Sequence, residues 1–136
     1  MAWQAGDSAE FSKTISETDV YLFAGITGDL NPVHVDAVRA AQSRFGERIA
    51  HGMLGASLVC TVLGTRLPGP GTIHLEQTLR FEHPVRLGDT LTARVEVTDI
   101  QQRGSTQRIR LATTVTNQDG VRVVVGEALV MPPSPL

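Results

Sequence analysis

The segment that most limits what this chain can fold into is HGMLGASLVCTVLGTRL at residues 51–67, which reads as a helix that is apolar on nearly every side. Such a helix has to be enclosed by other protein, because it offers water no polar face. Its uncharged centre, residues 53–64, is too short to span a bilayer. Small residues such as Gly55 and Ala56 let other backbone approach closely, and PGPG at 68–71 ends the helix. The remaining chain must therefore provide a layer that wraps around it.

The second half of the chain predicts such a layer. Apolar residues recur there with a period of two, which is typical of strands with one buried face. The recurring positions are Ile73, Leu75, Leu79 and Phe81; Leu91, Ala93, Val95 and Val97; Ile109, Leu111, Thr113 and Val115; and Val121, Val123 and Val125. Turn residues separate these runs at 88–89, 103–105 and 118–120. We expect an α+β fold, with a curved antiparallel β-sheet around the central apolar helix.

The first half predicts shorter elements. AEFSKTI at 9–15 reads as a strand, and residues 16–28 read as a helix that starts at Ser16 or Thr18 and stops at Gly28. A second short helix is expected over residues 35–46. A sheet of this kind leaves exposed edges, so we expect the protein to pair with itself as a homodimer through the sheet.

The amino-acid composition limits the classes of function that the chain can have. The chain has 136 residues, is 41% hydrophobic and 19% charged, and carries a net charge of −2, which indicates one globular domain over residues 1–136. With only 4% aromatic residues and no basic cluster, binding to nucleic acid or to an anionic membrane is disfavoured. Cys60 is the only cysteine, so no intrachain disulfide can form, and the N-terminus does not read as a signal peptide. We expect a cytoplasmic protein.

One decapeptide, GITGDLNPVH at 25–34, carries unusual chemistry for such a fold. It places Asp29, Asn31 and His34 around Pro32, which suits a loop better than a helix interior. A carboxylate and an imidazole aimed at one atom could perform acid–base chemistry. The alternative is that Asp29 caps a turn and His34 bonds to backbone, and the spacing alone does not decide between them.

A second feature is His51-Gly52 at the start of the apolar helix. Helix N-termini present unpaired N–H groups, and a glycine lets a ligand oxygen come close, so Gly52 could help to form an oxyanion site. Gly52 could equally serve only helix–sheet packing. Cys60 reads as a core residue by itself. No metal-binding, dinucleotide-binding, phosphate-binding or serine-hydrolase motif is recognisable, and we expect neither a metal nor a cofactor.

Taken together, GDLNPVHVD at 28–36, IAHGMLGASL at 49–58 and LEQTLRFEHPVRLGDTLTARVEV at 75–97 resemble the MaoC-like (R)-specific enoyl-CoA hydratases, also called hydratase 2, which have a hot-dog fold. The resemblance runs from about residue 16 to residue 131. It implies addition of water to trans-2-enoyl-CoA to give (R)-3-hydroxyacyl-CoA, and the reverse reaction.

The resemblance also implies roles for individual residues. Asp29 and His34 match the catalytic pair that holds the water, and Asn31 matches the asparagine that shapes the loop. Gly52 matches the glycine whose N–H binds the thioester oxygen. Two further residues, Ser57 and Cys60, are expected to line the acyl pocket.

Several alternatives stay open at this point. The chain could act as a 3-hydroxyacyl-thioester dehydratase of chain elongation, or as a non-catalytic acyl-binding subunit. A thioesterase is disfavoured, because the central helix has no acidic residue. The thioester partner could be coenzyme A or an acyl carrier protein, and its phosphates could meet Arg80, Arg86 or Arg103.

Overall fold

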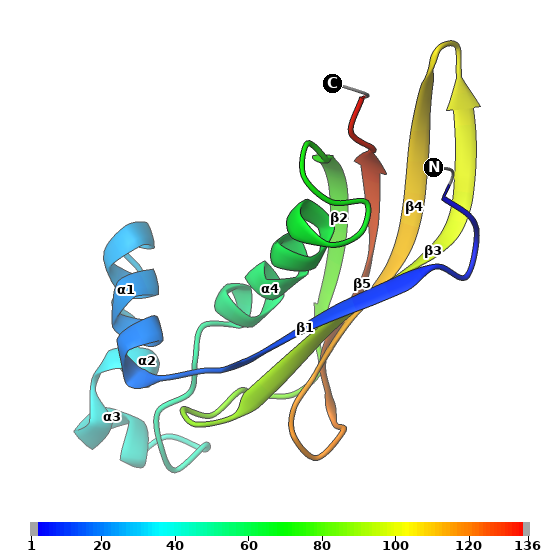
Figure 1. The fold of residues 1–136 in the computed structure, drawn as a ribbon. Helices are drawn as coiled ribbons and strands as arrows, with labels where there is room; N and C mark the ends of the chain where they lie inside the picture. The colour runs from blue at the N-terminus through cyan, green and yellow to red at the C-terminus, as the bar shows by residue number, and fades with distance from the viewer. Residues whose placement is uncertain (1–2, 135–136) are drawn as a thin grey trace.

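A computed structural model of the protein describes residues 3–134 and contains one five-stranded antiparallel sheet with four helices (Figure 1). The elements, in chain order, are β1 (Ser8–Thr14), α1 (Glu17–Thr27), α2 (Pro32–Val35), α3 (Ala37–Ala41), α4 (Gly52–Thr65), β2 (Ile73–Phe81), β3 (Thr90–Arg103), β4 (Thr106–Thr116) and β5 (Arg122–Met131). The strand order is β1-β3-β4-β5-β2, so β1 and β2 are the two edges.

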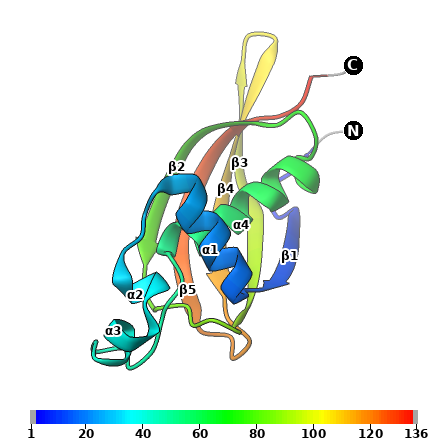
Figure 2. The same cartoon turned by 90° about the vertical axis from the view of Figure 1, so that its left-hand side faces the viewer.

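The apolar helix α4 lies across the curved sheet, as the sequence predicts (Figures 1 and 2). Its core-facing residues, among them Val59, Val62 and Leu63, are almost fully buried in one cluster with the sheet. Every predicted core position of β3 and β4 is buried. The expected α+β hot-dog architecture is confirmed. None of the helices among residues 3–134 is long and apolar enough to cross a membrane.

Local sequence signals explain the ends of α1. Ser16 accepts a hydrogen bond from the Asp19 N–H, and the Asp19 carboxylate accepts one from the Ser16 N–H, which forms a capping box. Gly28 ends the helix with φ = 79°, a left-handed conformation that glycine adopts without strain. The predicted helix over residues 16–28 is thus confirmed, and the chain turns directly into the Asp29 segment.

The prediction for residues 32–46 is partly wrong. His34 lies on a one-turn helix, α2, rather than on a loop, because Pro32 occupies the first helical position, where its missing N–H costs nothing. The next helix, α3, starts after the cap Asp36 and ends at Ala41, five residues before the expected stop at Gly46.

Two strand predictions are also corrected. A bulge between His74 and Glu76 shifts the register of β2, so that His74, and not Ile73, lies opposite Val130. Ile73 therefore does not share a face with Phe81. In β5, the predicted face of Val121, Val123 and Val125 is wrong: the residues opposite the core positions of β4 are Val124, Ala128 and Val130. Val123 and Val125 are buried as well, but Val121 is only half-buried.

Helices α1, α2 and α3 gather beyond the N-terminal end of α4 (Figures 1 and 2). An ion pair ties α1 to the segment that leads into α4: Arg48 donates to Glu17 and to the Tyr21 hydroxyl, each at 2.9 Å. The hydrogen bond and positive charge of Arg48 lower the pKa of Glu17. This contact helps to hold the helical cap over the end of α4.

Candidate active site

Asp29 lies in the short connection between α1 and α2. Its carboxylate accepts a hydrogen bond from the Asn31 N–H at 3.1 Å, and the Asn31 side chain accepts one from the Val33 N–H at 3.2 Å as the cap of α2. These two local bonds set the path of the chain from Gly28 to α2. Asn31 therefore shapes the segment, while the Asp29 side chain remains exposed.

His34 projects inward from α2 and is only 8% exposed. Its Nδ1 lies 2.7 Å from the carbonyl oxygen of Ile49, so Nδ1 carries the proton and donates it. In the neutral ring, Nε2 then has a free lone pair. The geometry suits a group that takes a proton at Nε2 and later returns it.

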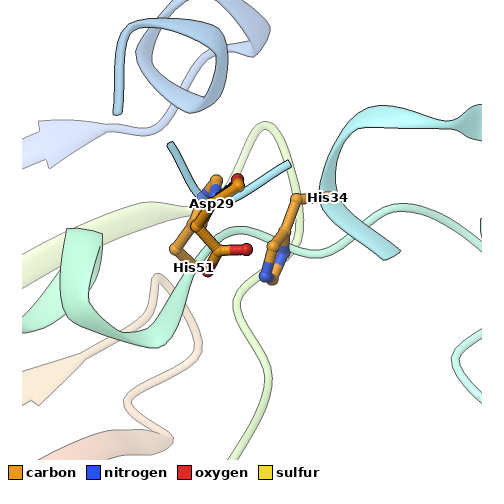
Figure 3. A group of neighbouring side chains, drawn as sticks. All are labelled: Asp29, His34 and His51. Atoms are coloured by element: carbon orange, nitrogen blue, oxygen red, sulfur yellow. Dashed lines mark hydrogen bonds between the residues drawn. The ribbon is translucent and has the colours of Figure 1, made fainter. Parts of the chain in front are cut away.

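His51 comes from a third element, the N-terminal cap of α4, and lies beside these two residues. Its Nε2 lies 3.0 Å from the backbone oxygen of Asp29, and its ring stacks on His34 with 3.9 Å between centroids and 27° between planes. Figure 3 shows the three side chains together, with the Asp29 carboxyl group pointing towards the His34 ring. The sequence alone gives His51 no role; the signal that it offers is the position of this histidine directly before Gly52 in the HGM motif.

Gly52 is the first residue of α4. Within residues 3–134 its N–H has no hydrogen-bond acceptor, as expected for the first turn of a helix. A Cβ placed on Gly52 would lie 2.8 Å from Cδ1 of Phe81, which is closer than real Cβ contacts. The absence of a side chain thus leaves the N–H accessible and makes room for Phe81.

Two hollows meet at these residues. One, of about 350 Å³, is lined by Phe23, Thr27, Asp29, His34, His51, Gly52 and Met53. The other, of about 260 Å³, lies towards β2 and the loop that follows it, and includes Phe81, Pro84 and Val85. His34 and Gly52 line both hollows. An extended ligand that passes from one hollow to the other would therefore lie beside both the His34 imidazole and the free N–H of Gly52.

Asp29, His34 and His51 also lie close enough to be considered as metal ligands, with one possible ligand atom of each within 4.8 Å of the others. Imidazole lone pairs lie in the plane of the ring, so the lone pairs of stacked rings run side by side instead of converging on one ion. His51 Nε2 and His34 Nδ1 are moreover committed to carbonyl oxygens. The group therefore fits acid–base chemistry better than metal binding.

Two further residues predicted to line the acyl pocket, Ser57 and Cys60, lie outside the two hollows, and their role in that pocket stays a prediction. Ser57 donates to the Met53 carbonyl, and Cys60 is exposed with its Sγ 3.8 Å from Nδ1 of His74. The prediction that Cys60 is a core residue is wrong, because that face of α4 is not covered by the described chain.

The three arginines considered for the carrier phosphates also line neither hollow. Arg80 pairs with Glu82 at 3.0 Å and Arg86 with Glu47 at 3.6 Å, while Arg103 ends β3 at the distant hairpin. The arginine that does line the smaller hollow is Arg44, whose guanidinium lies 4.8 Å from the centre of the Phe45 ring.

Comparison with known proteins identifies the family. The protein-family model of the MaoC-like domain matches residues 3–120 of the chain. The chain belongs to the MaoC-like family. This MaoC-like chain is 50% identical to an (R)-specific enoyl-CoA hydratase of Rhodospirillum rubrum, over 95% of the chain and 88% of the relative. It is 49% identical to a 3-hydroxybutyryl-CoA dehydratase of Methylorubrum extorquens, over 96% and 81%.

A solved structure agrees with the sequence relatives. The MaoC-like chain superimposes on the (R)-hydratase from A. caviae involved in PHA biosynthesis with a TM-score of 0.92 and 42% identity, covering 97% of the chain and 98% of that structure.

Proposed function

We propose that the protein is an (R)-specific enoyl-CoA hydratase, which adds water to trans-2-enoyl-CoA to give (R)-3-hydroxyacyl-CoA and catalyses the reverse dehydration. The observation that carries the proposal is the convergence of Asp29, His34 and the start of α4 at Gly52 on one hollow of about 350 Å³. The relatives named above are an (R)-specific enoyl-CoA hydratase and a 3-hydroxybutyryl-CoA dehydratase. Hydration and dehydration are the two directions of one reversible reaction.

The chemistry that this arrangement supports begins with a water molecule between the Asp29 carboxylate and Nε2 of His34. The water oxygen forms a bond to C3 of the enoyl thioester, and one of its protons passes to the Asp29–His34 pair. The electron pair of the C2=C3 double bond forms a C1=C2 bond, and the π pair of the carbonyl moves onto the thioester oxygen to give an enolate. The carbonyl then re-forms as the C1=C2 pair takes a proton from the Asp29–His34 pair at C2, so the protein ends with the protons it had at the start.

Gly52 stabilises the enolate in this scheme. Its N–H is free, and it stands at the positive end of the α4 dipole. An N–H that is already oriented towards the developing oxyanion needs no reorganisation during the reaction, which is why such donors contribute strongly to catalysis. The two hollows suit a long substrate: the thioester would lie where they meet, beside His34 and Gly52.

The first experiment measures the loss of enoyl-thioester absorbance when the protein is mixed with crotonyl-CoA. We expect rapid hydration by the wild type and a loss of about 10²–10⁴-fold in kcat for both Asp29→Asn and His34→Ala. Asp99→Asn, an equivalent change at an exposed position of β3, serves as the control and should keep full activity.

The outcomes separate the alternatives. Hydration with an (R) product, determined by chiral chromatography, supports the proposal, whereas an (S) product contradicts it. Release of free thiol indicates a thioesterase. Higher kcat/KM with the acyl-carrier-protein thioester than with the CoA thioester indicates a chain-elongation dehydratase, and an inactive wild type indicates a non-catalytic acyl-binding subunit.

We also propose that the protein forms a homodimer through β2. This strand is an edge of the sheet and carries exposed apolar residues, including Ile73 and Leu75, which are 50% and 41% exposed. Exposed apolar side chains on an unpaired edge favour strand pairing with a second copy. A partner there would also cover the exposed face of α4 around Cys60.

Sedimentation or light scattering tests the dimer. We expect twice the mass of one chain for the wild type and a shift towards monomer for Leu75→Glu. Val38→Glu is the matched control, because Val38 is 72% exposed on α3, away from β2. A monomeric wild type, or a Leu75→Glu variant that remains fully dimeric, contradicts pairing through β2.

A further inference from the structure

His51 makes contacts that the reaction scheme above does not use. It is only 2% exposed, and its ring has two aromatic neighbours, Phe23 at 4.9 Å and His34 at 3.9 Å between centroids. Its Nε2 bonds to the backbone oxygen of Asp29. One side chain thus contacts both residues of the proposed catalytic pair, although neither is close to it in sequence.

The hydrogen bond fixes which nitrogen of His51 carries a proton. A carbonyl oxygen only accepts, so Nε2 must donate, and Nδ1 of the neutral ring is left as an acceptor. Nδ1 is buried and has no hydrogen-bond partner within residues 3–134. Burial of an unpaired polar atom is unfavourable, so an apolar ring would pack here at lower cost if stacking were the only requirement. The imidazole is therefore explained by the proton that it donates from Nε2.

We propose that His51 is a positioning residue for the hydration reaction, an inference that rests on the proposed function of Asp29 and His34. Its Nε2–H holds the main chain at Asp29, which fixes where the carboxylate stands. Its stacked ring sets the plane of His34, which fixes where Nε2 of His34 points. Both catalytic groups are thereby held towards the hollow beside Gly52 by the residue that immediately precedes Gly52 in the chain.

Three substitutions of His51 test its hydrogen bond to the Asp29 backbone and its stacking on His34 separately. His51→Phe keeps a flat ring against His34 but removes the donor to Asp29, whereas His51→Gln keeps a donor near the position of Nε2 but removes the ring. His51→Ala removes both. We expect kcat to fall about five- to tenfold in each of the first two and about 25- to 100-fold in His51→Ala, which loses both contacts. KM for crotonyl-CoA should stay within about threefold, because His51 positions catalytic groups instead of binding substrate.

The split between kcat and KM, and the partial rescue by Phe and Gln, distinguish positioning from a general structural role. Rates are expressed per folded enzyme, with folding checked by circular dichroism. A kcat within about threefold of wild type in folded His51→Ala overturns the proposal, as does a loss expressed mainly in KM. If His51→Ala does not fold, His51→Phe and His51→Gln decide: unchanged kcat in both overturns the proposal, and reduced kcat with unchanged KM supports it.

A second measurement does not depend on activity. The chain has four histidines, so the long-range ¹H–¹⁵N spectrum of the imidazole rings can be assigned from His34→Ala and His51→Gln. We expect His51 protonated at Nε2 and His34 protonated at Nδ1. A His51 ring protonated at Nδ1 would overturn the positioning contact. An inactive wild type with the expected tautomers would instead contradict the proposed function and leave the contact itself intact.

Discussion

Gly52 offers the sharpest test of the oxyanion site, because replacement by alanine adds a single methyl group at the start of α4. That methyl carbon would lie 2.8 Å and 2.9 Å from two ring carbons of Phe81. The best separation of two carbon atoms is about 3.5–4.0 Å, so the ring must move by more than half an ångström. Phe81 is 51% exposed and lines the smaller hollow, so its ring has space to rotate.

The expected effects on stability and on activity differ. Rotation of Phe81 costs about 0.5–1.5 kcal/mol, and the replacement of glycine by alanine in a helix regains up to about 1 kcal/mol, so the free energy of unfolding should change by about 1 kcal/mol or less. In contrast, the methyl group and the displaced ring crowd the space in front of the Gly52 N–H. Loss of one oxyanion donor lowers kcat by about 10²–10³-fold.

The assay compares initial rates with crotonyl-CoA and urea unfolding curves for the wild type and Gly52→Ala. Gly25→Ala is the matched control: it makes the same change at an exposed position of α1, where the new methyl would meet nothing within 4 Å. We expect the control to retain full activity and to gain about 0.5–1 kcal/mol. A folded Gly52→Ala variant with wild-type kcat would refute the assignment of this N–H to the oxyanion.

Two further predictions concern the fold that carries the site. Gly126→Ala should destabilise the protein by about 3 kcal/mol or more in urea unfolding, because the new Cβ would lie 1.8 Å from the backbone oxygen of Thr78. An unchanged midpoint of the urea unfolding curve would contradict the packing of β2 against β5. Asp19→Ala should cost about 1 kcal/mol at pH 7, because it breaks the capping box of α1. The Ser16 N–H, and then Lys13, lower the pKa of Asp19 from its ordinary value of 3.8. The stabilisation by the Asp19 carboxylate is therefore complete above the ordinary pKa of 3.8 and is lost as the pH falls through the lower pKa of the folded state. The difference in the free energy of unfolding between wild type and Asp19→Ala should therefore be smaller at pH 3 than at pH 7.

Much of the fold follows from short-range patterns in the sequence. The apolar helix, the alternating strands β3 and β4, and the two ends of α1 at Ser16 and Gly28 were all predictable. Each depends on neighbours within a few positions, where helix and strand periods and capping chemistry act. The bulge in β2 and the early end of α3 were not predictable, because no local sequence signal marks where strand pairing shifts or where a short helix ends.

Cys60 illustrates how tertiary structure overrides a sequence pattern. The residues around it are apolar on every side, so the sequence predicts complete burial of the helix. The sheet of one chain covers only part of α4, and the face with Cys60 stays exposed beside His74 on the edge strand. The burial of a helix face depends on which other elements pack against it, and the sequence of the helix alone does not specify those elements.

The sequence by itself determined which chemical groups are present and kept Asp29 and His34 within six positions of each other, since their separation is fixed by the chain. Tertiary structure alone decided that His51, seventeen positions beyond His34, stacks on that ring and bonds to the backbone of Asp29. The physical reason is that the contact requires α1 and α2 to pack over the N-terminal end of α4. That packing is set by the whole core and by no local pattern.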